Sequence, residues 1–82
     1  MVTVMREGGF RIVIYKDDHP PAHVHVIGDG QIIVRLIGEH GQPELIREWG
    51  STNADVRKAM RIVTEQQPYL LMRWNEIHVR TD

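Results

Sequence analysis

The chain has 82 residues, enough for one domain only, because either half of a split chain would lack a hydrophobic core. Hydrophobic residues make up 41% of it and charged residues 26%, which excludes a disordered chain and collagen. The absence of cysteine excludes disulfides, thiolate metal sites and cysteine nucleophiles. The formal net charge of −1 means that nucleic-acid binding would have to rely on a local basic patch. We therefore predict a single folded domain over residues 1–82.

The sequence shows no sign of a membrane segment. No apolar run approaches the ~20 residues that a membrane-spanning helix needs. The start, Met-Val-Thr-Val-Met-Arg-Glu, lacks the apolar stretch of a signal peptide. We expect a bacterial, cytoplasmic protein with no membrane partner.

The first half of the chain has the patterns of β-strands. Residues 10–15 alternate between two faces, with Phe10, Ile12 and Ile14 on one of them. Pro20 and Pro21 end this strand, because proline cannot donate to a strand ladder. A strand from His23 to Ile27, a turn at Gly28-Asp29-Gly30 and a strand from Gln31 to Ile37 then form a predicted hairpin.

Two further strands complete the predicted meander. Residues 44–49 follow a turn-rich segment, and residues 2–6 precede a turn at Gly8-Gly9. We expect four to five antiparallel strands over about residues 2–49. Trp49 is expected to anchor the end of the last strand just before the helix.

The second half has the pattern of one amphipathic helix over about residues 53–78. Thr52 and Asp55 are spaced as in a capping box at its start. Apolar residues then recur at helical spacing on both sides of Pro68, where we expect a kink or a brief break. This helix is the only segment that can cover the apolar face of the sheet, so we predict an α+β fold.

Strand alternation divides the side chains between the two faces of this sheet. The face under the helix is predicted to hold Phe10, Ile12, Ile14, Val24, Val26, Ile32, Val34 and Leu36. The open face is predicted to hold Arg11, Tyr15, His23, His25, Gln31, Ile33, Arg35 and Ile37. The histidines make this open face the densest group of reactive side chains in the chain.

One hypothesis makes the open face a metal-independent ribonuclease site that needs no cofactor. His23 and His25 would serve as general base and general acid, because imidazole exchanges protons near neutral pH. Arg35 would stabilise the phosphoryl charge through its planar fork of donors. Arg11, Tyr15 and His19 would bind and position the RNA.

Two other hypotheses use the same residues differently. His19, His23 and His25, with Asp17 or Asp18, form a ligand set suited to zinc or another divalent metal. Alternatively, the open face is a docking surface for a protein partner and has no enzymatic activity. The chain could also form a homo-oligomer. The spacing of the residues leaves these alternatives open.

The segment His-Pro-Pro-Ala-His-Val-His-Val, residues 19–26, and the ending Trp-Asn-Glu-Ile-His, residues 74–78, support a family resemblance. Over roughly residues 10–78 the chain resembles the bacterial family called domain of unknown function 4160. The resemblance implies a gene beside that of a second small family, in an arrangement similar to a toxin–antitoxin pair. It therefore implies a cognate small protein as partner, with this chain as either member.

Overall fold

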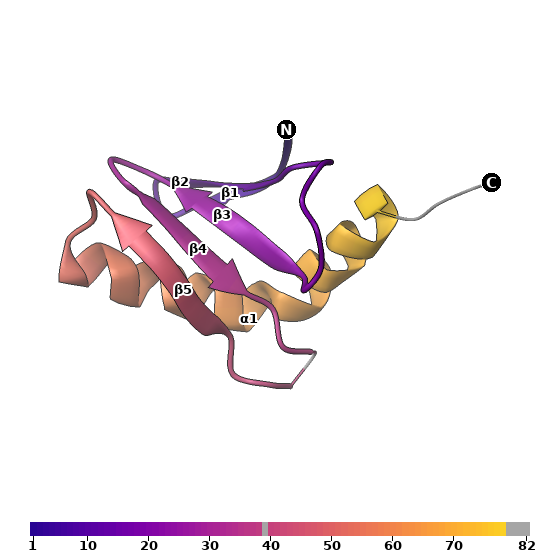
Figure 1. Ribbon diagram of the computed structural model, residues 1–82. Coiled ribbons are helices and arrows are strands. Elements are labelled where there is room, and N and C mark those ends of the chain that lie inside the picture. Colours follow the sequence, from indigo (N-terminus) through magenta and orange to yellow (C-terminus); the bar gives the residue numbers. More distant parts are fainter. Residues whose placement is uncertain (39, 79–82) are drawn as a thin grey trace.

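The computed structural model describes residues 1–38 and 40–78 and shows a five-stranded sheet followed by one helix (Figure 1). The sheet order is β1-β2-β3-β4-β5, with every neighbouring pair antiparallel. The elements are β1 (Val2–Glu7), β2 (Phe10–Ile14), β3 (His23–Ile27), β4 (Gln31–Arg35), β5 (Glu44–Trp49) and α1 (Asn53–His78). The predicted α+β fold is confirmed, with the meander in its five-stranded form.

Glycines shape the turns that join these strands. Gly8 and Gly9 both have positive φ, which lets β1 return tightly into β2. Gly28 N–H donates to the carbonyl of Gly30 at 3.0 Å and closes the β3–β4 turn. A Cβ on Gly30 would lie 2.3 Å from the carbonyl carbon of Gly50, so only glycine lets β4 begin beside the end of β5.

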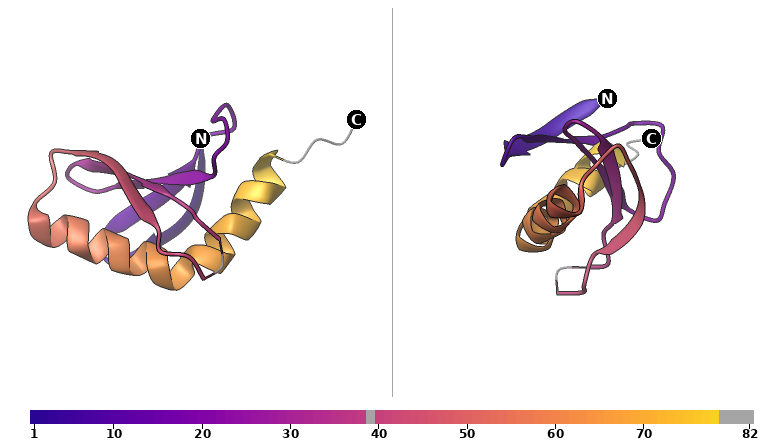
Figure 2. Two further views of the ribbon diagram at one scale, coloured as in Figure 1. Left: turned by 60° about the horizontal axis from the view of Figure 1, so that its bottom comes forward. Right: turned by 90° about the vertical axis from the view of Figure 1, so that its left-hand side faces the viewer.

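The core lies between α1 and one face of the sheet. Figure 2 shows, in the view along the helix, that α1 lies on one side of the sheet. All eight residues predicted for that face are buried there: Phe10, Ile12, Ile14, Val24, Val26, Ile32, Val34 and Leu36. The helix contributes Ala59, Ile62, Val63, Leu70 and Trp74. The predicted assignment of the two sheet faces is therefore confirmed. Val13 is fully buried as well, although it points to the open face.

The helix begins with the predicted cap and runs through its proline. Thr52 Oγ1 accepts a hydrogen bond from Asp55 N–H at 3.1 Å. Pro68 lies inside the continuous span Asn53–His78, so the chain bends there without a break. Figure 2 shows the axis changing direction in the orange part of the helix. Within the described residues, no helix is long and apolar enough to cross a membrane.

One prediction about the edge of the sheet is wrong. Trp49, expected to be an anchor, is 46% exposed. Its cross-strand partner is Gln31, which places it on the open face. The reason is an irregularity in β5: Arg47 pairs with Ile33 but Leu45 pairs with Val34, which leaves Ile46 as an extra residue.

Candidate functional site

Three side chains meet where the loop after β2 folds over the start of β3. Asp18 Oδ2 lies 3.2 Å from His23 Nε2 and 3.2 Å from His25 Nε2. The three ligand atoms lie within 4.8 Å of one another. All three side chains are mostly buried, with 21%, 20% and 11% of Asp18, His23 and His25 exposed. We call this group the histidine–aspartate centre.

The local chain path explains how the three side chains converge. His23 and His25 are two positions apart on β3, so both project from the same face of the sheet. Asp18 N–H donates to the carbonyl of Tyr15 at 3.1 Å, and this turn directs the loop back over β3. The carboxylate therefore reaches the histidines from the loop and not from a strand.

His23 is oriented by the backbone of the proline pair. Its Nδ1 lies 2.9 Å from the carbonyl oxygen of Pro21. A carbonyl only accepts, so Nδ1 carries the hydrogen and Nε2 faces Asp18. The other side of the ring packs against Trp74 of α1, with ring centroids 5.2 Å apart. His23 thus links the centre to the C-terminal part of the helix.

His25 is oriented by the neighbouring strand. Gln31 Nε2 donates to His25 Nδ1 at 2.9 Å, while His25 Nε2 faces Asp18. The ring of Tyr15 meets the imidazole edge-on, with centroids 4.6 Å apart. Burial lowers the pKa of His25 below 6.5, and it outweighs the opposing attraction of Asp18. The lowered pKa favours the neutral form of His25 at pH 7.

The remaining predicted site residues lie around this centre. Arg35 is the cross-strand partner of His23, and its Nη1 lies 3.6 Å from Glu44 Oε1. His19 is exposed and lines a groove with Asp18 and His78, but it is not one of the three residues of the histidine–aspartate centre. In the structure Asp18, and not His19, completes the group with His23 and His25.

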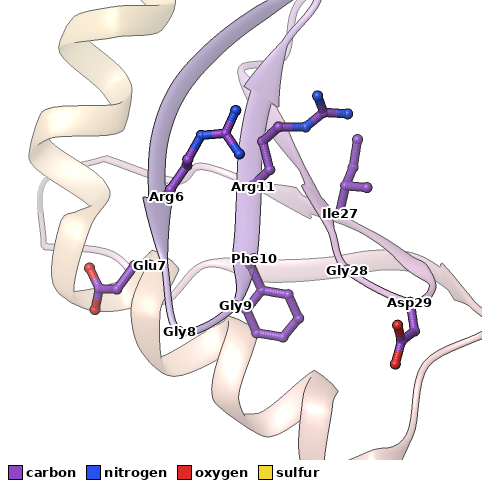
Figure 3. Close-up of a pocket in the computed structure, with 9 residues that line it drawn as sticks. All are labelled: Arg6, Glu7, Gly8, Gly9, Phe10, Arg11, Ile27, Gly28 and Asp29. Atoms are coloured by element: carbon purple, nitrogen blue, oxygen red, sulfur yellow. The ribbon is translucent and has the colours of Figure 1, made fainter.

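Arg11 lies on the same face of the sheet as the centre, near the start of β2. Its cross-strand partners are Arg6 on β1 and Ile27 on β3. These residues line an open groove of about 700 Å³ at the β1–β2 and β3–β4 turns (Figure 3). Ile27 is two positions from His25 on β3, so Arg11 is a diagonal cross-strand neighbour of His25 on the open face and lies farther from His23.

Gln31 and Trp74 contact the histidines, although sequence reasoning assigns neither of them to the site. In the sequence, Gln31 is notable only for its predicted place on the open face. A single amide on a strand does not form a motif with a recognisable spacing. Trp74 lay on the apolar stripe of the helix and is buried as a core residue there, with 5% exposed. Its stacking on His78, at 3.8 Å between centroids, adds a further histidine to this end of the helix.

Comparison with known proteins places the chain in a family. No curated protein and no solved structure matches it. The model of one family, described as Domain of unknown function (DUF4160), matches residues 9–75 and so covers most of the chain. This range includes the whole histidine–aspartate centre. The chain therefore belongs to the family of domain of unknown function 4160.

Proposed function

We propose that the histidine–aspartate centre binds a divalent metal ion, with zinc as its first candidate. The observation that carries this proposal is the shared carboxylate oxygen, 3.2 Å from the Nε2 atom of each imidazole. Ligands 2.0–2.1 Å from the centre of a tetrahedron stand ~3.3 Å apart. Two edges of the group therefore already have the length that a tetrahedral zinc ion needs.

The hydrogen-bond pattern supports the same proposal. The Nδ1 of His23 donates to Pro21, so the Nε2 of neutral His23 carries no hydrogen. This lone pair points at a carboxylate oxygen of Asp18, which is also a hydrogen-bond acceptor, so the two atoms repel each other unless something lies between them. The contact is favourable only if a positive charge lies there, either a proton or a metal ion. Metal-bound histidines use their second nitrogen in just this way, to donate to a carbonyl or carboxylate.

His25 can enter the same coordination sphere with one local change. In the present arrangement Gln31 donates to Nδ1, so the hydrogen of neutral His25 is on Nε2. Rotation of the Gln31 amide by a half-turn would present its oxygen to Nδ1 and move that hydrogen away from Asp18. His25 Nε2 would then be free to bind metal.

Three protein ligands leave one position of a tetrahedral ion open. Such a position holds water in catalytic zinc sites, where the ion lowers the pKa of the water toward neutrality. The ligand side chains are about a tenth to a fifth exposed, so solvent reaches the group. The function proposed is thus metal binding with one exchangeable position.

A second candidate follows if the positive charge is a proton. His23 would then be an imidazolium beside neutral His25, which is the acid and base pair that metal-independent RNA cleavage uses. Arg35 opposite His23 and Tyr15 against His25 would serve this reaction. In this form the chain would be the ribonuclease toxin of a bacterial two-gene module, cytoplasmic and bound by its cognate protein.

Calorimetric titration of the purified chain with Zn²⁺ tests the first proposal. We expect one ion per chain and loss of binding in Asp18→Asn, His23→Gln and His25→Gln. His19→Gln is the matched control, because His19 is exposed on the same loop but outside the centre. Circular dichroism establishes that each variant is folded. Absence of binding, or equal loss in the control, contradicts the proposal.

Cobalt and RNA measurements separate the two candidates. Co²⁺ in the centre should give the intense visible absorption of a tetrahedral site, which disappears in His23→Gln. Cleavage of RNA that continues in EDTA and is lost in His23→Gln would instead support the proton-transfer candidate. If RNA remains intact and no metal binds, both chemical candidates fail. The remaining hypothesis is then that the open face is a docking surface for a protein partner.

A further inference from the structure

The open face of the sheet is more basic than the chain as a whole. Arg6, Arg11, Arg35 and Arg47 lie on this face, from four of the five strands. Among the strand residues that share the face, Glu44 is the acidic one, and it already pairs with Arg35. The formal net charge of the whole chain is −1. The strand residues of the face that α1 leaves uncovered therefore carry a net positive charge, although the whole chain is slightly negative.

Two of these arginines are direct cross-strand partners. Arg6 on β1 is opposite Arg11 on β2, and like charges in that position destabilise a sheet. Figure 3 shows both side chains leaving the sheet on the same side, away from Phe10. Within the described residues neither arginine has a salt bridge. An anion between the two guanidinium groups would remove this repulsion.

Arg6 and Arg11 begin a row of cross-strand partners that crosses the open face, and an aromatic side chain lies at its far end. The cross-strand partners that continue from Arg11 are Ile27, Gln31 and then Trp49 on β5. Trp49 is 46% exposed, and the guanidinium of Arg47 lies 5.3 Å from its ring centroid. Three strand spacings, ~14 Å, separate Arg11 from Trp49. The row thus offers a phosphate site and a stacking site at separate points.

We propose that this row, Arg6, Arg11 and Trp49 with Arg47, binds single-stranded nucleic acid. The arginine pair would hold backbone phosphate, and a base would stack on Trp49. Base stacking on an exposed ring needs an unpaired base, which favours a single strand over a duplex. An acidic peptide would satisfy the arginines but would make no use of the indole. The inference does not depend on the proposed metal ion.

The acidic groups near this row lie at its border. Glu7 and Asp29 line the groove beside the arginine pair but come from the turns at its end. Glu7 is the cross-strand partner of Phe10, whose side chain is in the core, so Glu7 projects from the helix side of the sheet. Neither carboxylate makes a salt bridge to Arg6 or Arg11 within the described residues. The row therefore keeps its positive charge.

Fluorescence anisotropy of the full chain with labelled 12-residue oligo(U) tests this proposal, in EDTA and at low salt. We expect saturable binding that weakens with salt. Arg6→Gln/Arg11→Gln should reduce affinity about tenfold or more, and should lower the salt slope by about 0.7, because the pair holds one phosphate and each neutralised phosphate contributes about 0.7. Trp49→Ala should reduce affinity about tenfold with little change in the salt slope.

The matched control is Arg57→Gln/Arg61→Gln, which removes two charges from the exposed side of α1. It should bind like the parent chain. Oligo(dT) in place of oligo(U) shows whether the 2′-hydroxyl contributes, and tighter binding to either strand than to a duplex supports the proposal. Absence of binding at low salt, equal loss in the control, or preference for poly-glutamate over both strands would overturn it. Because EDTA removes any metal, failure here would leave the proposed metal centre unaffected.

Discussion

The imidazole of His23 and the indole of Trp74 pack together, with 5.2 Å between their ring centroids. This contact joins the loop-covered end of β3 to α1. It also places a natural fluorophore beside the histidine–aspartate centre. Events at His23 should therefore be visible in the emission of Trp74.

The first prediction uses this contact. In a Trp49→Phe background, Trp74 is the remaining tryptophan, and Cu²⁺ bound at the centre should quench its emission strongly. His23→Gln should remove the quenching, whereas His19→Gln should leave it unchanged. Fluorescence titration measures this directly. Equal quenching in all three proteins would show that copper acts elsewhere on the chain.

Gln31 should affect metal affinity without binding the metal. It holds His25 through Nδ1, and removal of such an orienting partner usually weakens metal binding 10- to 100-fold. We expect Gln31→Leu to lower zinc affinity by about tenfold and to keep one ion per chain. Competition with a chromophoric chelator gives the affinity. Unchanged affinity would mean that His25 is not a ligand.

Stability of the metal-free protein should depend on pH through His25. Burial lowers the pKa of His25 below 6.5 in the folded state, so the unfolded chain binds more protons between 6.5 and that lowered value. Stability is therefore greatest above pH 6.5 and falls as the pH decreases through this window. Urea denaturation in EDTA between pH 8 and pH 5 measures the slope. His25→Gln should have a flatter profile, and equal slopes would exclude His25 as the cause.

Gln67 of the helix forms two hydrogen bonds with the backbone of the β4–β5 connection. Its side chain is 1% exposed, accepts a hydrogen bond from Ile37 N–H at 2.9 Å and donates to the carbonyl of Gly41 at 2.8 Å. Gln67→Leu would leave both backbone groups without this partner, so we expect a loss of about 2–3 kcal/mol in the free energy of unfolding. Gln66→Leu, at the neighbouring half-buried position, should change it by less than ~0.5 kcal/mol.

The helix cap offers a test with an internal control. Thr52→Ala removes the acceptor of Asp55 N–H and should cost about 1 kcal/mol. Thr64 Oγ1 instead donates to the carbonyl of Met60, inside the helix, where alanine has the better propensity. Thr64→Ala should therefore be neutral or slightly stabilising. Thermal or urea denaturation compares the two. A larger loss for Thr64→Ala would contradict the assignment of the cap.

The sequence was sufficient for the parts of the fold that follow local rules. Alternation in residues 10–15 and 31–37 identified the buried face, because each strand has one side under the helix. Thr52 and Asp55 marked the start of α1, because capping depends on neighbours three residues apart. The expected bend at Pro68 followed from the missing backbone donor.

Other features depend on contacts that spacing does not encode. Leu45 and Trp49 are four residues apart, yet the irregularity in β5 places them on opposite faces. Asp18 was one of two candidate carboxylates, and only the path of the loop brings it to His23 and His25. In the sequence, Gln67 stands out only as a polar residue on the apolar stripe of the helix. Its hydrogen-bond partners, Gly41 and Ile37, lie 26 and 30 residues away, so spacing does not reveal them.

The order of the elements along the chain has a consequence for protein synthesis. Every strand pairs with its neighbour in sequence, so the sheet can assemble as each hairpin leaves the ribosome. The helix that covers its apolar face follows the sheet in the chain, so it is translated after the strands. At 5–20 residues per second its 26 residues take roughly 1–5 s. Until the helix packs on the sheet, Ile12, Val26 and Val34 lack their cover, and exposed apolar surface of this kind makes a folding chain prone to aggregation.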